Sequence, residues 1–261
     1  MGFSLLKWMA PIPKIPGHMN AIFVGPHPDD IEVGAGGTAA YLSAAGARVT
    51  FIVCTDGGGG SMDGATAVDA LVATRKRETK ASAAMLGAAE TVFLDFPDGG
   101  KYDVWDLACA LAGIFARIGP DIVFCPDPGL SSEIHPDHLK CGEATRTAIV
   151  LSGFPLLLKR NGIPFDETQP LEPRKTLAHY YTHRPNRYVP LTRELQDLKM
   201  TSVMCHASQF PEGAGDERRL IKAYLSLRAR RFGRRIFRPF AEGFYVLGPL
   251  HQHGFPEVQD Y

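Results

Sequence analysis

The chain lacks the features that mark several classes of protein. It has five cysteines among 261 residues, an odd number, and no two of them stand in a Cys-x-x-Cys pair. This argues against a disulfide framework and against a cysteine zinc site. The chain has no excess charge of either sign, because 28 Lys and Arg balance 28 Asp and Glu. Bulk charge therefore gives no reason to expect nucleic acid or an anionic membrane as a partner.

The sequence also has no apolar run long enough to span a membrane. Its first 18 residues hold a short apolar patch broken by three prolines, without a clear cleavage site, and we expect a cytoplasmic protein. One stretch departs from the even distribution of charge: "RARRFGRR", residues 228–235, carries five arginines. Its first interpretation is the solvated end of a helix, and its second is a patch for an anionic substrate or partner.

Short apolar segments alternate with amphipathic segments along the first half of the chain. The pattern predicts strands at 21–25, 48–55, 91–96 and 121–126, and helices at 36–46, 73–87 and 104–119. Further on it predicts strands at 177–183 and 242–248, and helices at 193–210 and 216–233. We interpret 153–175, which carries four prolines, as an irregular excursion that permits a lid or a contact in a homo-oligomer.

This alternation indicates βαβ units and a mostly parallel sheet covered by helices on both faces. The fold class is therefore α/β, with one domain over residues 1–261. In open α/β sheets, ligands bind beyond the carboxyl ends of the strands. Polar residues follow several predicted strands at these ends, so we expect a site along one edge of the sheet.

Two similar clusters of histidine and aspartate contribute to that edge. "HPDD" at 27–30 follows the first predicted strand, and "HPDH" at 135–138 follows the fourth. A catalytic zinc ion takes three protein ligands and leaves one position for water. His27 and Asp30 can reach one ion from a single turn, and His138 can complete the set from the other cluster.

The remaining residues of the two clusters suit the hydrolysis of an amide. A carboxylate beside the metal can act as general base, which is the role we assign to Asp29. His135 lies near the ion, with Asp137 to orient it. The alternative is that the first cluster is only a turn in which Asp29 or Asp30 caps the following helix.

A glycine-rich loop, "DGGGG" at 56–60, follows the second predicted strand. Such a loop can cradle a phosphate, but no Lys-Ser/Thr follows it and the Gly-x-Gly-x-x-Gly context after the first strand is absent. Flexible gating of a substrate fits better. A non-catalytic Rossmann-type module that binds a nucleotide is the alternative from another class of function.

Taken together, the motifs resemble those of the PIG-L/LmbE-like zinc-dependent N-deacetylases. "PHPDD" at 26–30 and "HPDH" at 135–138 look like the paired signatures of that family. The chain is also similar to the family in five further segments, in the same order between about residue 20 and residue 246: "CTDGGGG" (54–60), "RKRETKASAAMLG" (75–87), "FPDGG" (96–100), "KMTSVMCHASQF" (199–210) and "AEGF" (241–244).

The resemblance implies a Rossmann-like three-layer fold and a role for each matched residue. Zn²⁺ would be bound by His27, Asp30 and His138. Asp29 would be the general base, while His135 would stabilise the oxyanion or protonate the leaving amine, with Asp137 tuning it. Arg75 would bind a group of the substrate. For Asp98, two interpretations stay open: a turn residue and a residue that contacts the substrate.

The chain departs from the family at two places. The family usually has a carboxylate directly after the second aspartate of its first signature, but here Ile31 stands there and Glu32 follows. Some members have a tyrosine two residues before the second signature, where this chain has Glu133. Tyr180 or Tyr181 can replace that tyrosine, and the sequence does not decide between them.

We therefore expect a zinc-dependent hydrolase that removes an acetyl group from an N-acetylglucosamine-type amide. Its partner would be a small-molecule N-acetylated sugar or glycoconjugate. The alternative within the same class is an amidase that cleaves a larger acyl group from a thiol or sugar conjugate.

Overall fold

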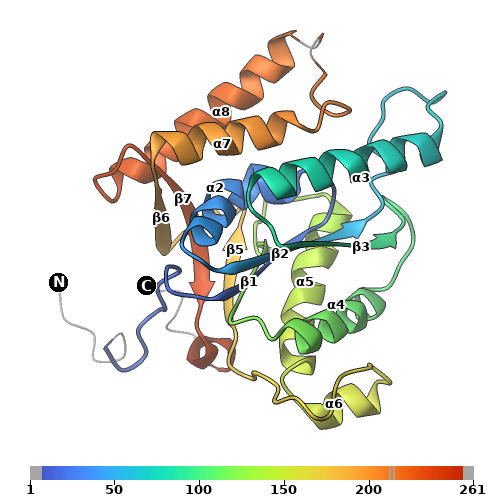
Figure 1. The fold of residues 1–261 in the computed structure, drawn as a ribbon, viewed down its shortest axis with the longest axis vertical. Helices are drawn as coiled ribbons and strands as arrows, with labels where there is room; N and C mark the ends of the chain where they lie inside the picture. Colours follow the sequence, from blue (N-terminus) through green and yellow to red (C-terminus); the bar gives the residue numbers. More distant parts are fainter. Residues whose placement is uncertain (1–7, 212, 214, 255–261) are drawn as a thin grey trace.

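The computed structural model describes residues 8–254, except 212 and 214. A seven-stranded sheet runs through its middle, in the order β3-β2-β1-β4-β5-β7-β6 (Figure 1). Strands β1 to β5 run parallel to their neighbours in that order, whereas β7 is antiparallel to both β5 and β6. The strands are β1 (Asn20–Gly25), β2 (Arg48–Thr55), β3 (Glu90–Phe96), β4 (Ile122–Pro126), β5 (Thr176–Tyr180), β6 (Arg187–Leu191) and β7 (Phe240–Leu247).

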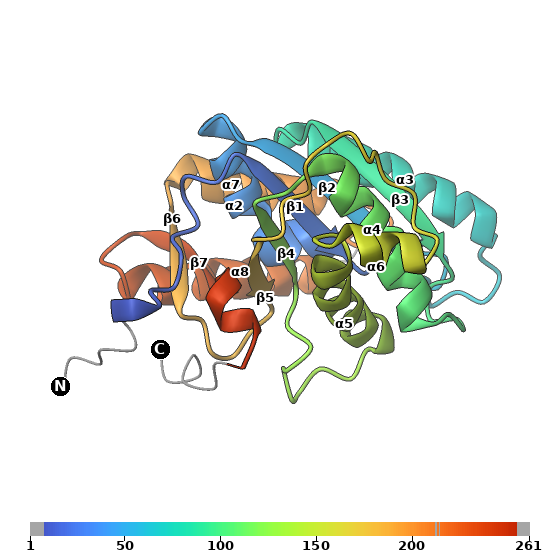
Figure 2. The ribbon, with the colours of Figure 1, turned by 90° about the horizontal axis from the view of Figure 1, so that it is seen from below.

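Helices cover both faces of this sheet. Figure 2 shows α4, α5 and α6 on the side of the sheet that faces the viewer. Helices α2, α3, α7 and α8 lie on the other side (Figure 1). The helices are α2 (Asp30–Ala44), α3 (Val68–Met85), α4 (Val104–Ile118), α5 (Pro136–Leu151), α6 (Pro155–Arg160), α7 (Arg193–Met204), α8 (Gly215–Arg234) and the short 3₁₀ helix η1 (Pro249–Gln252).

The two layers of helices enclose two separate apolar clusters. Alternate side chains of a strand point to opposite faces, so in β1 Phe23 packs in the cluster that contains α2, and Ile22 and Val24 pack in the cluster that contains α4 and α5. Phe23 stacks on Phe124 of β4, with ring centroids 4.2 Å apart. The expected α/β class and three-layer sandwich with a mostly parallel sheet are confirmed.

Several local predictions differ from the structure. The helix expected at 73–87 begins at Val68, the helix expected at 193–210 ends at Met204, and the strand expected at 177–183 ends at Tyr180. Helix α2 begins at Asp30, six residues before the expected start at residue 36. Residues 155–160 form α6, so the irregular interpretation of 153–175 was wrong there; Pro155 begins the helix, where its missing N–H costs nothing. Strand β6 was not among the expected elements. It carries Pro190, which is tolerated there because β6 is at the edge of the sheet.

The strand order determines where a site can form. From β1 the sheet continues through β2 to β3 on one side and through β4 to β5 on the other. The order thus reverses between β1 and β4, and ligands bind at such switch points, beyond the carboxyl ends of the strands. "HPDD" follows β1 and "HPDH" lies at the start of α5, after β4. The two clusters therefore meet at the switch point.

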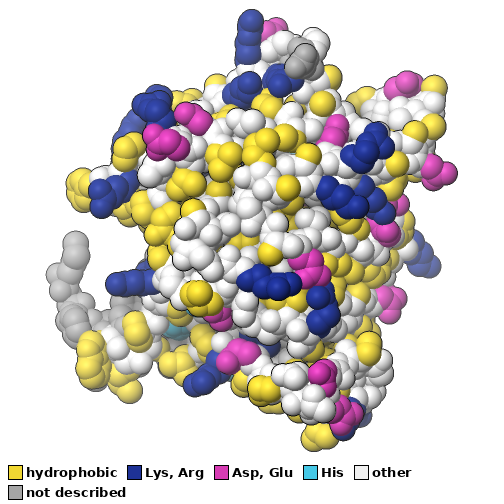
Figure 3. Space-filling view, in the orientation of Figure 1, with side chains coloured by type: hydrophobic (Ala, Val, Ile, Leu, Met, Phe, Trp, Pro, Cys, Tyr) yellow, Lys and Arg dark blue, Asp and Glu magenta, His cyan; other side chains and the backbone are white. Residues whose placement is uncertain are grey.

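Two further features of the structure concern the length of its apolar helices and the charge of its surface. No helix in the described part of the chain is long and apolar enough to cross a membrane. On the face seen in Figure 3, basic and acidic side chains are interspersed.

Candidate metal centre and active site

The three side chains expected to bind a metal ion meet at one carboxylate oxygen. Oδ2 of Asp30 lies 3.0 Å from Nδ1 of His27 and 3.4 Å from Nε2 of His138. The same oxygen accepts a hydrogen bond from the backbone N–H of His27, which folds the turn after β1 around Asp30. Two histidine nitrogens and a carboxylate oxygen thus converge, two of them from the turn between β1 and α2 and one from α5.

The capping interpretation of the first cluster does not hold. Asp29 occupies the N-cap position of α2 but makes no side-chain hydrogen bond to that helix. The Asp30 carboxylate is directed to the two histidines rather than to the helix amides. At the second cluster the cap of α5 is a histidine, because Nδ1 of His135 accepts from the N–H of Asp137.

Other donor atoms lie close enough to consider as ligands. His27, His135 and His138 offer nitrogens within 4.8 Å of one another, and His27 and His135 form a second such group with Asp98 and Asp137. Asp30 belongs to neither group, although its Oδ2 contacts both His27 and His138. We favour Asp30 over His135 as the third ligand because one of its oxygens already bridges the other two side chains.

Carboxylates hold the ring nitrogens that point away from Asp30. Nε2 of His27 lies 3.2 Å from Oδ1 of Asp98 and 3.3 Å from Oδ2 of Asp137. Nδ1 of His138 lies 2.8 Å from Oε2 of Glu133. Histidines that bind metals characteristically donate their second N–H to such a carboxylate, which fixes the ring and its tautomer.

The electrostatics of the centre favour a positive charge there. Burial lowers the pKa of His27, but hydrogen bonds to Asp137, Asp30 and Asp98 outweigh it and raise the pKa to about 12. Burial raises the pKa of Asp30, but the contacts with His138 and His27 bring it far below its usual range. The donor set therefore fits a divalent cation, which would take the place of the protons on the imidazoles.

Asp29 is held in a strained conformation beside this centre. Its φ is 117°, in the left-handed region that a non-glycine residue rarely adopts. Burial, followed by the negative charge of Asp30, raises its pKa to about 7, while Arg75 opposes the rise. A carboxylate with a pKa near neutrality can both take up and release a proton.

His135 is held as a neutral donor. Because Nδ1 accepts from a backbone N–H at 3.3 Å, the neutral ring carries its proton on Nε2. Burial, followed by the charges of His27 and His138, lowers its pKa. The ring can therefore offer an Nε2–H hydrogen bond to a developing oxyanion, as neutral imidazoles do in other enzymes.

The structure corrects the expected partner of Asp137. The sequence placed its carboxylate on His135, but Oδ2 lies 3.3 Å from Nε2 of His27 and accepts from the N–H of Gly99 at 2.8 Å, and Oδ1 accepts from the hydroxyl of Tyr102 at 2.8 Å. The side chain lies fully buried in the first turn of α5, directed away from the cap. Only its backbone N–H reaches His135.

Arg75 and Asp98, the two expected substrate residues, make contacts within the protein. The guanidinium of Arg75 is buried; it donates to the carbonyls of Gly57 and Pro28, both at 2.8 Å, and lies 3.4 Å from Oδ2 of Asp29. Oδ2 of Asp98 accepts from the N–H of Gly59 at 3.0 Å. These contacts fix Asp29 and the glycine-rich loop, and a substrate contact for either residue stays a prediction.

The open question about the tyrosines is resolved by their contacts. The Tyr181 hydroxyl donates to Oδ1 of Asp30 at 3.1 Å, and its ring stacks on His138 with centroids 5.9 Å apart. The Tyr180 hydroxyl donates instead to the carbonyl of Val24 at 2.8 Å, inside the core. Tyr181 is thus the residue at the site, although adjacent tyrosines on a strand gave no signal that separated them.

Glu32 and Ile31 have distinct surroundings one residue apart. Ile31 packs in the core against the sheet, so this position offers no carboxylate to the site. Glu32 is buried; it accepts from the Ser82 hydroxyl, and its Oε1 lies 3.2 Å from Nε2 of His206. The carboxylate therefore links α2 to α3 and to the end of α7, away from the proposed ligands.

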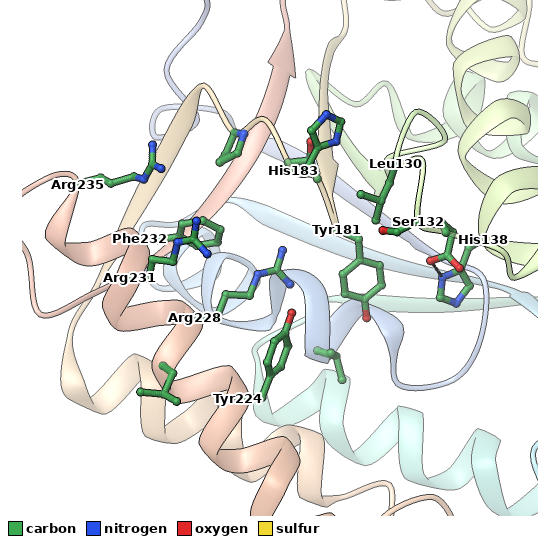
Figure 4. Close-up of a pocket in the computed structure, with 15 residues that line it drawn as sticks. Leu130, Ser132, His138, Tyr181, His183, Tyr224, Arg228, Arg231, Phe232 and Arg235 are labelled. Carbon is green, nitrogen blue, oxygen red and sulfur yellow. Dashed lines mark hydrogen bonds and ion pairs between the residues drawn. The ribbon is translucent and has the colours of Figure 1, made fainter.

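A cavity of about 760 Å³ opens beside the centre (Figure 4). Glu133, His138 and Tyr181 form its wall at the metal end. The rest of the wall comes from the turn after β5, from α8, from the loop before α5 and from Val33 of α2. This volume is in the range of ordinary small-ligand sites.

The fold and this centre define a metal-dependent hydrolase of the α/β class. Residues 22–149 match the model of the family PIG-L: GlcNAc-PI de-N-acetylase. Diacetylchitobiose deacetylase from Thermococcus kodakarensis is 32% identical over 235 residues, which cover 89% of this chain and 85% of that protein. The chain belongs to the PIG-L family of deacetylases, as the paired signatures predicted.

Two further comparisons agree with this assignment. The structure of N,N'-diacetylchitobiose deacetylase from Pyrococcus horikoshii superposes with a TM-score of 0.82 at 30% identity, covering 97% of this chain and 91% of that chain. The 1D-myo-inositol 2-acetamido-2-deoxy-alpha-D-glucopyranoside deacetylase from Kineococcus radiotolerans is 28% identical over 175 residues, which cover 55% of this chain and 48% of that protein. The Rossmann-like expectation and the enzyme class are thereby confirmed.

Proposed function

We propose that the chain removes the acetyl group from an N-acetylglucosamine-type amide in a small-molecule glycoside or glycoconjugate. The observation that carries the proposal is the convergence of Nδ1 of His27, Oδ2 of Asp30 and Nε2 of His138. These three atoms would hold Zn²⁺. When bound, the ion lowers the pKa of water to about 7 and polarises the amide carbonyl.

The neighbouring side chains supply the proton transfers. Asp29, fixed by Arg75, accepts the proton of the attacking water. The Nε2–H of His135 donates to the oxyanion of the tetrahedral intermediate, which is the group that most needs stabilisation. Protonated Asp29 then passes its proton to the departing amine, because the neutral ring of His135 keeps its own. Asp137 and Asp98 keep the His27 ring in place, and Glu133 does the same for His138.

The size of the cavity and the relatives support a sugar substrate. The relatives at 32% and 28% identity are named for diacetylchitobiose and for a 2-acetamido-2-deoxy-glucopyranoside of inositol. Both names describe an N-acetylated glucosamine unit. A cavity of about 760 Å³ beside His138 has room for such a unit and an attached group. The cytoplasmic location and a homo-oligomer contact through 153–175 stay predictions.

A deacetylation assay over a panel of N-acetylated sugars and conjugates tests the proposal. The enzyme is stripped with a chelator and reloaded with zinc, and released acetate is measured. We expect activity on N-acetylglucosamine-type amides that disappears with chelation and returns with zinc. Activity only on conjugates with larger acyl groups would support the amidase alternative. No bound metal and no hydrolysis would leave the nucleotide-binding module.

A further inference from the structure

The cavity that starts at His138 continues along one face of α8. Tyr224, Arg228 and Arg231, with Arg235 just beyond the end of the helix, line it (Figure 4). Their spacing of four, three and four residues is the spacing that places side chains on one helical face. Of the five arginines in residues 228–235, three therefore line the cavity, whereas Arg230 and Arg234 do not.

The three arginines on the cavity have no anionic partner among the described residues. None of them makes a hydrogen bond or an ion pair with any residue in the described part of the chain. Arg228, which is half-buried, has its guanidinium over the ring of Phe232 at 5.4 Å from the centroid. In Figure 4 its guanidinium extends into the space between α8 and Tyr181.

The cavity also supplies no carboxylate to balance them. Among its lining residues Glu133 alone is acidic. Its oxygens are taken by Nδ1 of His138 at 2.8 Å and by the N–H of His135 at 2.9 Å. One end of the cavity therefore reaches His138, one of the three proposed metal ligands. The other end carries positive charge that no described residue of the lining balances, in a chain whose net charge is zero.

We propose that the α8 end of this cavity binds a phosphate group carried by the substrate, so that the chain prefers phosphorylated N-acetylated sugars to neutral ones. This rests on the proposed deacetylase function, because the same molecule must place its amide at the metal end. Guanidinium groups match the oxygens of a phosphate with paired hydrogen bonds. Three of them along one face of a helix suit a dianion better than a single carboxylate.

The test compares substrates that differ in charge. The kcat/KM for acetate release is measured for N-acetylglucosamine 1-phosphate and 6-phosphate, for methyl N-acetylglucosaminide and for diacetylchitobiose, with zinc-loaded enzyme. We expect at least one phosphorylated sugar to exceed both neutral ones about tenfold, mainly through a lower KM, with the advantage shrinking as salt is raised. Comparison of the 1-phosphate with the 6-phosphate shows which placement of the phosphate relative to the amide fits the cavity.

Variants on α8 assign the effect to the cavity. Arg228→Gln and Arg231→Gln should each lower the ratio of phosphorylated to neutral kcat/KM about tenfold. Arg231→Glu should bring the ratio below one. Arg234→Gln removes the same charge from the same helix outside the cavity, and the ratio should stay at the wild-type value. Circular dichroism and melting curves confirm that each variant is folded.

Two results would overturn the proposal. One is equal kcat/KM for phosphorylated and neutral sugars in the wild-type enzyme, and the other is an equal loss of the ratio in Arg231→Gln and Arg234→Gln. A stronger preference for N-acetylmuramic acid, which carries a carboxylate, would overturn the assignment to phosphate.

A binding measurement separates this proposal from the deacetylase function. If no sugar releases acetate, calorimetry with glucosamine 6-phosphate, glucosamine 1-phosphate and glucosamine still measures the charge preference of the cavity. Tighter binding of a phosphorylated amine, weakened in Arg231→Gln, would support the phosphate site although the proposed reaction had failed. Equal binding of all three would reject the site.

Discussion

Oε2 of Glu133 lies 2.8 Å from Nδ1 of His138, while Nε2 of the same ring lies 3.4 Å from Asp30. The ring is thus held between a carboxylate on one side and the proposed metal position on the other. This places Glu133 behind a proposed ligand, at the position where some members of the family have a tyrosine. We infer that Glu133 orients His138 rather than donating to an oxyanion.

Glu133→Gln should weaken zinc binding without unfolding the protein. The amide has the shape of the carboxylate but not its charge, so His138 becomes a less basic ligand. Loss of such a partner typically costs about 10- to 100-fold in metal affinity. Competition with a chromogenic chelator measures the affinity. Glu167→Gln, an exposed loop position, is the control, and equal affinities in the two variants would contradict the role of Glu133.

Asp29→Asn should retain zinc and lose turnover. Asparagine tolerates the positive φ of 117° better than most residues, so the variant tests the proton transfer rather than the backbone. Loss of a general base typically costs about 10²- to 10⁴-fold in rate. Metal analysis and kcat are measured on the same preparation. If the zinc were lost together with the activity, Asp29 would be a ligand and not the base.

Much of the site was predictable because it depends on short motifs at strand ends. His27 and Asp30 are separated by one turn, and His138 follows the strand that neighbours theirs, so the topology of a parallel sheet brings them together. Glu133 and Tyr181 were not assigned, because each acts through another side chain. Nothing in their local sequence specifies that partner.

The elements that were missed were those in which tertiary packing overrides local signals. Pro190 argues against a strand until β6 is known to be at the edge of the sheet. Asp137 follows Pro136 at the start of α5, and its side chain turns inward to His27 rather than to the cap. Such directions depend on the packed helix, and spacing alone does not provide them.

Tyr181→Phe should lower zinc affinity while the fold persists. The hydroxyl donates to Oδ1 of Asp30 at 3.1 Å, and the ring can still stack on His138 without it. Loss of one hydrogen bond of this kind is worth about 1 kcal/mol, or about a fivefold change in affinity. Competition with a chelator measures the zinc affinity of the wild type and of Tyr181→Phe.

Tyr180→Phe is the matched control for that experiment. It removes an adjacent hydroxyl that donates to the carbonyl of Val24 in the core. We expect a loss of about 1–3 kcal/mol in the free energy of unfolding, because the carbonyl is left buried without its donor, and little change in zinc affinity. A larger loss of zinc affinity in Tyr180→Phe than in Tyr181→Phe would reverse the roles assigned to the two tyrosines.

Lys175→Met should stabilise the protein at neutral pH and do so less as the pH rises. Lys175 is only 1% exposed, and burial lowers its pKa from 10.5 to about 8, with the charge of Glu172 opposing the shift. The folded state thus binds this proton less tightly than the unfolded chain, so the free energy of unfolding of the wild type rises between about pH 8 and pH 10.5 as the buried charge is lost. Below pH 8 the penalty is fully present, and methionine avoids it; we expect a gain of about 2 kcal/mol in the free energy of unfolding at pH 7.

Urea unfolding of the wild type and of Lys175→Met at pH 7 and pH 10 measures this difference in the free energy of unfolding. Lys159→Met, at an exposed position, is the control. If this difference is absent at pH 7, or as large at pH 10 as at pH 7, burial of the Lys175 ammonium group does not destabilise the protein.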